Sequence, residues 1–313
     1  MHSAIPRLGI SACLLGQAVR YDGGHKLDPF LSESLGRFVE WVPVCPEVEI
    51  GMGVPRESVR LVGTPETPRM IAERSGKDWT FAMARFAAAR TRQLMELELS
   101  GYVFKKNSPS CGMGRVSVYN RKNMPVRGGR GLYAAVVIDR LAPMPVEEES
   151  RLSDRRLREN FVERVFAFHR WQNLQAEKKS PAALMEFHAR HKYLLLAHSQ
   201  RHYSQLGRLV AEVKRSTVSA TYDAYGRTFM ETLRLPANAK KHANVLEHML
   251  GYFSGELTTA ERRELVKLIS DYRRERVPLI VPITLIQHYV KKYHCACLNG
   301  QTYLSPAPKE LLL

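Results

Sequence analysis

The sequence has few cysteines and no long apolar run. Five cysteines among 313 residues are a sparse, odd-numbered set, which does not suit the disulfide framework of a small secreted protein. No stretch approaches the roughly 18 apolar residues that a membrane-spanning helix needs, and residues 1–10 lack the zones of a signal peptide. We therefore expect a cytoplasmic protein outside the membrane, whose cysteines serve metal binding or catalysis.

Acidic side chains are also scarce relative to basic ones. The chain has 47 Lys and Arg against 31 Asp and Glu, a net charge of +16. Residues 1–148 hold 20 basic and 15 acidic side chains, and residues 149–313 hold 27 and 16, so the excess is +5 in the first part and +11 in the second. Such an excess indicates a polyanionic partner, although a basic surface that only aids solubility has the same composition.

The hydrophobic pattern changes from strand-like to helical along the chain. Short apolar runs bounded by turn residues occupy the first half, whereas apolar residues recur at helical spacing from Arg151 onward. We expect an α/β domain over residues 1–148, Rossmann-like with a mainly parallel sheet. A helical linker over 149–185 and an all-α domain over 186–313 should follow. No strand is expected after Pro145.

Three cysteines stand at the ends of predicted buried strands. The first predicted strand, Arg7–Cys13, ends at Cys13, and the apolar runs Phe38–Val44 and Tyr102–Phe104 lead to Cys45 and Cys111. The carboxyl ends of parallel strands meet at one edge of a sheet, where α/β proteins bind ligands. The sequence therefore predicts that three cysteines far apart in the chain converge.

The segment 105–114 around Cys111 is not helical. Pro109 favours extended geometry before it, and Gly112 and Gly114 permit positive φ or close approach of another group. This pattern presents Cys111 to a ligand, although a tight turn with an inert cysteine has the same features. Further on, the glycine-rich segment 128–131 before a predicted helix indicates either a phosphate seat or close packing.

Three thiolates fit a [4Fe-4S] cluster better than zinc, because structural zinc usually takes four ligands, commonly in Cys-x-x-Cys pairs that are absent here. Such a cluster has one iron without a protein ligand, which favours Lewis-acid catalysis over electron transfer. Cys295 and Cys297, near the end of a helix in the second domain, are not expected to take part.

Four blocks carry a resemblance to a known family. They resemble the signature blocks of the thiouracil desulfurase family over about residues 6–146. The resemblance implies a [4Fe-4S] cluster bound by Cys13, Cys45 and Cys111. It also implies a non-redox replacement of thiocarbonyl sulfur by oxygen from water. The blocks are Ile10-Ser11-Ala12-Cys13-Leu14-Leu15-Gly16, Val19-Arg20-Tyr21-Asp22-Gly23, Val44-Cys45-Pro46-Glu47 and Asn107-Ser108-Pro109-Ser110-Cys111-Gly112.

The resemblance also implies a catalytic pair, Glu47 and Ser108. A carboxylate beside the cluster would move protons, and a hydroxyl would orient the attacking water. Without the resemblance, a solvated loop acid and a turn-capping hydroxyl are the simpler interpretations. The sequence after Glu47 departs from the usual pattern, so Glu49 is a weaker candidate.

The second domain is similar, over residues 187–312, to an uncharacterised family marked by the block Phe187–His198. Its histidines lie on one helical stripe without acidic ligands, which favours packing or nucleic-acid contact over a metal site. Fusion of the two domains implies a desulfidase acting on 4-thiouridine in tRNA. The alternatives are a desulfurase of free thiouracil or thionucleosides, and a non-catalytic RNA-binding protein with a structural metal. The expected RNA contacts are Arg190, Lys192, Lys291 and Lys292.

Overall fold

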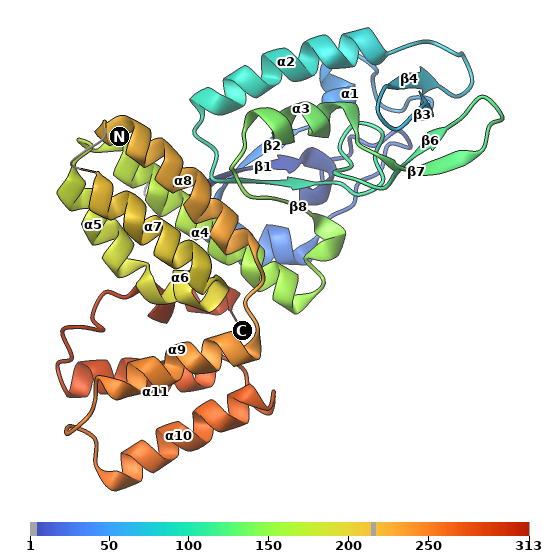
Figure 1. The fold of residues 1–313 in the computed structure, drawn as a ribbon. Coiled ribbons are helices and arrows are strands. Elements are labelled where there is room, and N and C mark those ends of the chain that lie inside the picture. Colours follow the sequence, from blue (N-terminus) through green and yellow to red (C-terminus); the bar gives the residue numbers. More distant parts are fainter. Residues whose placement is uncertain (1–4, 214–216, 313) are drawn as a thin grey trace. The chain divides into compact units, whose positions relative to one another are not determined.

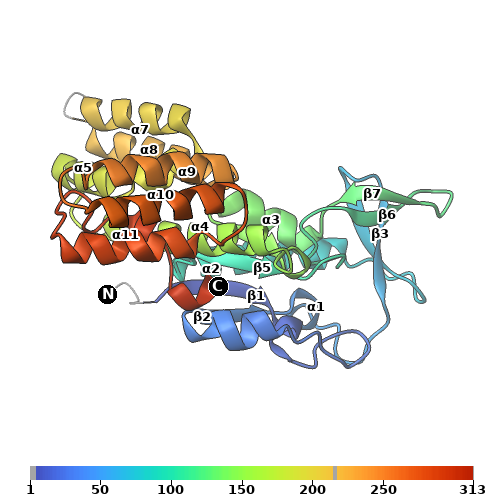
Figure 2. The same ribbon diagram turned by 90° about the horizontal axis from the view of Figure 1, so that it is seen from below.

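The computed structural model describes residues 5–213 and 217–312. It has two compact units, Met1–His169 and Arg170–Leu313, drawn in Figures 1 and 2. The division falls inside helix α4 (Arg155–Ala176), within the segment 149–185 expected as a linker. Each unit is described below by itself.

The first unit is built around a four-stranded parallel sheet, here called sheet A. Its strand order is β2-β1-β5-β8, and each neighbouring pair is parallel. Strand β5 is buried along its whole length, as is most of β1, which explains their continuous apolar sequence. The predicted α/β architecture with a mainly parallel sheet is confirmed. The strands are β1 (Arg7–Ser11), β2 (Glu40–Val44), β5 (Gly101–Phe104) and β8 (Val146–Glu148).

Strand β8 corrects the expectation that no strand follows Pro145. Its three residues, Val-Glu-Glu, have no apolar run, yet they pair in register with Tyr102, Val103 and Phe104. Glu147 is 5% exposed and forms ion pairs with Arg151 at 2.6 Å and Arg164 at 3.9 Å. The acidic residues Glu147 and Glu148 thus belong to a strand of the sheet, and two arginines compensate the buried charge of Glu147.

A second sheet, sheet B, lies in the same unit with strand order β4-β3-β6-β7. Strands β3 and β4 form an antiparallel hairpin, β6 pairs parallel with β3, and β7 pairs antiparallel with β6. Strand β7 was not predicted from the sequence, because its residues are mostly exposed and form no apolar run. The strands are β3 (Val59–Gly63), β4 (Pro68–Ala72), β6 (Val116–Tyr119) and β7 (Pro125–Gly129).

Two helices cover one face of sheet A (Figure 1), and one continuous apolar core joins these helices to both sheets. Tyr102 and Phe104 of β5 stack at 4.1 Å between ring centroids, and Tyr133 packs edge-on against both. Position 9 of β1 requires glycine, because a Cβ atom there would lie 2.1 Å from the Tyr102 ring. The helices of this region are α1 (Pro46–Glu49), α2 (Thr80–Glu96) and α3 (Leu132–Arg140).

The second unit contains only helices among its described residues, which confirms the all-α expectation. Its core includes Trp171, Phe187, Tyr225 and Phe229, and Gly226 leaves room for the Trp171 indole. No helix among the described residues is both long and apolar enough to cross a membrane. Besides the end of α4, the helices are α5 (Pro181–Arg190), α6 (Lys192–His198), α7 (Gln200–Glu212), α8 (Val218–Arg234), α9 (Ala239–Gly251), α10 (Thr259–Arg273) and α11 (Ile280–Lys292).

Candidate functional site

The three predicted cysteines follow the carboxyl ends of three neighbouring parallel strands. Cys13 lies two residues after β1, Cys45 directly follows β2, and Cys111 lies in the loop after β5. Cys13 and Cys111 are buried, and Cys45 is half-buried. Each of the other two thiols contributes to raising the pKa of Cys111, which places all three within electrostatic reach of one another. The predicted convergence is therefore present in the structure.

Burial dominates the protonation of these thiols. It raises the pKa of Cys13 to about 11, against the opposing effect of Lys105. It also raises the pKa of Cys45 and, more strongly, that of Cys111, where a hydrogen bond with the Ser11 hydroxyl acts in the opposite direction. A free nucleophilic cysteine usually has a lowered pKa. Metal coordination, by contrast, deprotonates a thiol outright, so the environment suits metal ligands better than nucleophiles.

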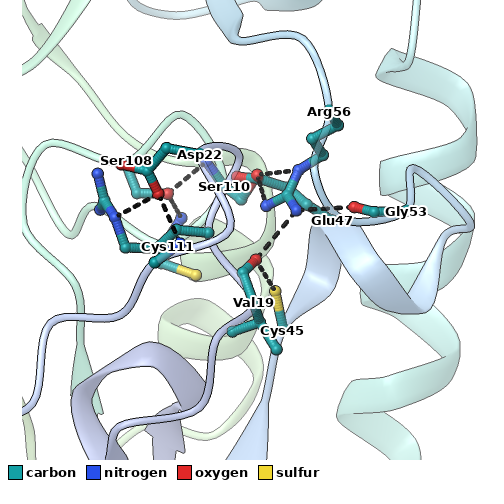
Figure 3. A network of polar contacts seen from close by, with 11 residues as sticks. Val19, Asp22, Cys45, Glu47, Gly53, Arg56, Ser108, Ser110 and Cys111 are labelled. Carbon is teal, nitrogen blue, oxygen red and sulfur yellow. Dashed lines mark hydrogen bonds and ion pairs between the residues drawn. The ribbon is translucent and has the colours of Figure 1, made fainter.

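Glu47 is held beside Cys45 by a nearly buried arginine. Arg56 donates to Glu47 Oε2 from Nε at 3.0 Å and from Nη2 at 2.5 Å, and the two side chains are 5% and 14% exposed. Ser110 donates its hydroxyl to Glu47 Oε1 at 2.7 Å. Figure 3 shows this network, in which the carboxylate of Glu47 connects α1, directly after Cys45, to the loop after β5. Glu47 is thus a fixed carboxylate rather than a solvated loop acid.

Arg56 also connects the second signature block to the site. Its Nη1 donates to the carbonyl oxygen of Val19 at 3.0 Å and to that of Gly53 at 2.9 Å. The same Val19 oxygen accepts a hydrogen bond from the Cys45 thiol at 3.7 Å. Arg56 and Ser110 are the functional residues that sequence reasoning missed. Ser110 stood within a quoted block, whereas no local pattern marked Arg56.

Ser108 caps the turn that carries Cys111. Its Oγ accepts hydrogen bonds from the backbone N–H groups of Ser110 at 3.2 Å and Cys111 at 3.0 Å. A hydroxyl has two acceptor lone pairs and one donor hydrogen. Both acceptor positions of Ser108 are occupied by the turn, so its remaining capacity is to donate. Glu49 has a local role, because it accepts from the Cys45 N–H at 3.1 Å and pairs with Arg90 at 3.5 Å.

Of the two glycines in the cysteine loop, Gly112 acts through close approach, and neither has a positive φ. A Cβ on Gly112 would lie 2.4 Å from Val116 Cγ2, whereas one on Gly114 would meet nothing within 4 Å. The positive φ values fall instead on Asn107 and Arg115, both at 57°. The expectation of close approach is thus confirmed for Gly112, and positive φ at the two glycines is wrong.

The glycine-rich segment before α3 seats the cysteine loop. The N–H groups of residues 131–134 donate to the carbonyl oxygens of Pro109, Ser110 and Gly112 at 2.8–3.1 Å. A Cβ on Gly131 would lie 2.5 Å from the Ser110 carbonyl group. The first amides of α3 are therefore occupied by the loop, and close packing, not a phosphate seat, explains this segment.

The donor set at the sheet edge consists of three thiols. No group of three His, Cys, Asp or Glu side chains within residues 5–213 and 217–312 is arranged to hold a single metal ion. In a [4Fe-4S] cluster each thiolate binds a different iron, so the ligands stand farther apart than around one ion. Three sulfurs from three strand ends, two of them buried and one half-buried, fit such a cluster and would leave one iron without a protein thiolate. Cys295 and Cys297 belong to the other unit, where they are half-buried and exposed.

The four residues expected to contact RNA lie in the second unit at helix ends. Arg190 ends α5 and Lys192 begins α6, whereas Lys291 and Lys292 end α11. Arg190, Lys291 and Lys292 are exposed and Lys192 is half-exposed. Lys292 forms an ion pair with Glu261, with 2.6 Å between Nζ and Oε1.

The histidine stripe of this unit is explained by individual hydrogen bonds. His191 and His198 are buried and lie 2.7 Å and 2.5 Å from the carbonyl oxygens of Phe187 and Leu235. His188 bonds to Tyr225 at 3.1 Å, and His202 bonds to Ser199 at 2.8 Å. These partners support the packing interpretation over a metal site.

Comparison with known proteins gives matches for both parts of the chain. Residues 8–149 match the family described as 2-thiouracil desulfurase, and residues 192–308 match a family described as a protein of unknown function (DUF1722). The chain is 37% identical over 151 residues to the uncharacterized protein YbgA of Escherichia coli (strain K12), covering 48% of this chain and 89% of that relative.

Two further relatives match a similar share of the chain. The uncharacterized protein YbbK of Bacillus subtilis (strain 168) is 32% identical over 155 residues, which are 46% of this chain and 97% of that protein. A solved structure titled [4Fe-4S]-dependent thiouracil desulfidase TudS is 30% identical, with a TM-score of 0.38, and covers 48% of this chain and 94% of its own. The chain belongs to the 2-thiouracil desulfurase family, with the desulfurase domain in its N-terminal part joined to a second domain.

Proposed function

We propose that this chain is a desulfidase in which Cys13, Cys45 and Cys111 bind a [4Fe-4S] cluster. The observation that carries the proposal is the meeting of three thiols, two buried and one half-buried, at one sheet edge. Glu47 lies in α1, two residues after Cys45, and Ser108 lies in the loop that carries Cys111. Membership of the 2-thiouracil desulfurase family supports the reaction class, and the 30% sequence identity to the [4Fe-4S]-dependent thiouracil desulfidase TudS supports the cofactor. The reaction replaces the thiocarbonyl sulfur of a pyrimidine by oxygen from water.

The protein's own residues would position water and substrate. When bound, the cluster would supply a Lewis-acidic iron for the thiocarbonyl sulfur. Glu47, fixed by Arg56 and Ser110, would accept a proton from the attacking water through its carboxylate. The Ser108 hydroxyl, with both acceptor positions used by the turn, would donate a hydrogen bond to the substrate or to the water.

The substrate in this proposal is 4-thiouridine in tRNA, which becomes uridine. Residues 149–313 carry an excess charge of +11, and phosphate contacts by Lys and Arg would give this part of the chain its affinity for RNA. Arg190, Lys192, Lys291 and Lys292 are the contacts that we propose, and a small thiolated pyrimidine would need none of them.

The test is anaerobic purification of the full chain, followed by iron and sulfide analysis and turnover of thiolated tRNA and free 2-thiouracil. We expect a brown protein with about four irons per chain. Serine at position 13, 45 or 111 should abolish iron retention, and serine at 295 or 297 should not. A colourless protein that holds zinc would instead support an RNA-binding protein with a structural metal. Turnover of free thiouracil without turnover of tRNA would refute the tRNA assignment alone.

A further inference from the structure

Ser11 carries a buried hydroxyl that the reaction above does not use. It is the last residue of β1, two residues before Cys13, and it is 2% exposed. A serine directly before a helical turn usually caps that turn, whereas the Oγ of Ser11 accepts a hydrogen bond from the Lys105 N–H at 3.0 Å. Lys105 is the residue directly after β5. Ser11 therefore connects the end of β1 to the start of the loop that carries Cys111.

The contact with Lys105 leaves the hydroxyl hydrogen of Ser11 available for donation. A hydroxyl has one donor hydrogen and two acceptor lone pairs, and the Lys105 N–H occupies one of the lone pairs. The hydroxyl forms a second hydrogen bond with the sulfur of Cys111. Both side chains are buried, so bulk water cannot take the place of either partner. One side chain thus supports the backbone of the loop and a cysteine sulfur at the same time.

The three sulfurs at the sheet edge are stabilised by different kinds of group. The sulfur of Cys45 accepts hydrogen bonds from backbone N–H groups of α1. Cys13 lies within reach of positive charges, of which Lys105 acts most strongly. At Cys111 the donor is a side chain, the hydroxyl of Ser11. A backbone donor remains after any substitution except proline, so Ser11 is the position where a donor to one of these sulfurs can be deleted cleanly.

A hydrogen bond to a ligand sulfur changes the electronic properties of an iron–sulfur cluster. It withdraws electron density from the thiolate, which stabilises the more negative, reduced state and raises the reduction potential. A thiolate that donates less charge also leaves the metal a stronger Lewis acid. The proposed reaction exchanges sulfur for oxygen without electron transfer, so the second effect is the one that would serve it.

We propose that Ser11 is a positioning residue that donates a hydrogen bond to the Cys111 sulfur when that sulfur is a cluster ligand. The inference rests on the proposed function, because it needs the cluster, and it adds a residue that sets the electronic state of that cluster. Ser11 differs in this respect from Glu47 and Ser108, which would act on water and substrate. Its effect passes through Cys111 alone.

The experiment compares the full-length wild type with Ser11→Ala and Ser11→Thr, each purified anaerobically with its cluster. The alanine variant lacks the hydroxyl, and the threonine variant keeps it on a β-branched side chain that suits a strand. The matched control is Ser100→Ala. It removes another buried serine hydroxyl, which lies before β5 at the opposite end of that strand and bonds to His169 at 3.3 Å. The reduction potential is measured by redox titration followed by EPR, and iron and sulfide analysis confirms the cluster content.

The variant Ser11→Ala should have a reduction potential about 59 mV below that of wild type. This shift is equivalent to a ten-fold change in the relative stability of the two oxidation states of a one-electron couple, and a hydrogen bond to a charged group contributes about that factor. Ser11→Thr and Ser100→Ala should keep the wild-type potential. A purely structural role would change cluster retention without shifting the potential of the loaded protein. Equal potentials in Ser11→Ala and wild type would therefore overturn the proposal.

A second measurement decides the proposal if Ser11→Ala retains no iron. In protein reconstituted in D2O, the hydroxyl of Ser11 carries deuterium, and pulsed EPR of the reduced cluster detects a deuteron bonded to a ligand sulfur. We expect one such coupling in wild type that persists in Ser11→Thr. Absence of an exchangeable coupling in wild type would contradict the proposal without any variant.

The two proposals fail in different ways. A wild-type chain that binds no [4Fe-4S] cluster would refute the proposed function. A loaded wild type that desulfurates thiolated pyrimidines, with the same potential as Ser11→Ala, would refute the role of Ser11 alone. The redox titration requires no turnover, so it decides the role of Ser11 even in a loaded protein that is inactive.

Discussion

The pair of Arg56 and Glu47 permits a quantitative prediction for the variant Arg56→Met. The substitution keeps an unbranched apolar side chain in place but removes the two hydrogen bonds to Glu47 Oε2 and those to the carbonyl oxygens of Val19 and Gly53. Glu47 is 14% exposed, so water would replace the lost donors only in part. The carboxylate would then keep Ser110 as its one donor among the contacts described above.

Breaking a buried ion pair by removing one partner costs about 3–5 kcal/mol. Because Glu47 is partly exposed, we expect a cost near the lower end of this range, about 3 kcal/mol. This cost is a large share of the roughly 5–15 kcal/mol that stabilises a domain. The double variant Glu47→Gln/Arg56→Met should recover part of the loss, because an amide is far less costly to leave unpaired than a carboxylate. We expect a coupling energy of about 2 kcal/mol from the double-mutant cycle.

Hydrogen exchange read by mass spectrometry measures this cost in the first unit alone. Peptides from β1, β2 and β5 of the metal-free protein should exchange roughly 150-fold faster in Arg56→Met than in wild type, the factor equivalent to 3 kcal/mol. Peptides from α8 in the second unit serve as the internal control. If the exchange rates of peptides from β1 and β2 change by less than about three-fold, the ion pair of Arg56 and Glu47 does not stabilise the site.

Three further predictions concern catalysis, pH and RNA. Glu47→Gln and Ser108→Ala should retain iron and sulfide but lower kcat by roughly 100 to 10,000-fold, and near-normal kcat in either variant would remove that residue from the mechanism. Burial, assisted by the charge of Arg170, lowers the pKa of His191 in the folded protein to about 3 from 6.5. As the pH falls below 6.5, His191 binds a proton in the unfolded chain but not in the folded one, so the folded state loses stability. Urea unfolding should show that the second unit loses about 2 kcal/mol between pH 7 and 5. The variant His191→Gln should lose less free energy of unfolding over the same pH range. Equal losses in the variant and wild type would show that His191 does not cause the pH dependence. Glutamate at the four proposed RNA contacts should weaken turnover of tRNA but not of free thiouracil. The wild-type affinity for tRNA should fall with salt at a log-log slope of about −4 if five phosphates are contacted. If the variant with glutamate at Arg190, Lys192, Lys291 and Lys292 shows wild-type tRNA turnover and wild-type salt dependence, these four residues do not form the RNA-binding surface.

The convergence of the cysteines was predictable because it follows from local signals. The residues of β5 are apolar without interruption, as expected of a strand buried on both faces, and turn residues follow it. Parallel pairing then brings the residues after β1, β2 and β5 to the same edge without any knowledge of side-chain contacts. The helices of the second unit were predictable for the same reason, since their apolar positions repeat at helical spacing.

Pairing between distant side chains was not predictable from such signals. Arg56 belongs to a glycine-rich segment with no periodicity, and only the fold brings it to Glu47 and Val19. Strand β8 was missed because Glu147 and Glu148 suggest a solvated charge run, and its strand character depends on pairing with β5. The roles of Gly112 and Gly131 likewise depend on which groups approach them, which no composition records.

The acidic residues at β8 show how the site depends on that missed strand. Glu148 Oε1 accepts from the Met113 N–H at 2.8 Å, and Glu149 accepts from the Lys106 N–H at 2.8 Å and pairs with the Lys105 Nζ at 2.5 Å.

These contacts fix both ends of the loop that carries Ser108 and Cys111, while the first amides of α3 fix its middle. A loop held by its backbone on three sides keeps a thiol and a hydroxyl in place without help from a ligand. A domain that ended at 148 would lack Glu149 and also Phe168, which packs on the core of the first unit from α4. The part of the chain that positions Cys111 therefore extends beyond the acidic run, into α4.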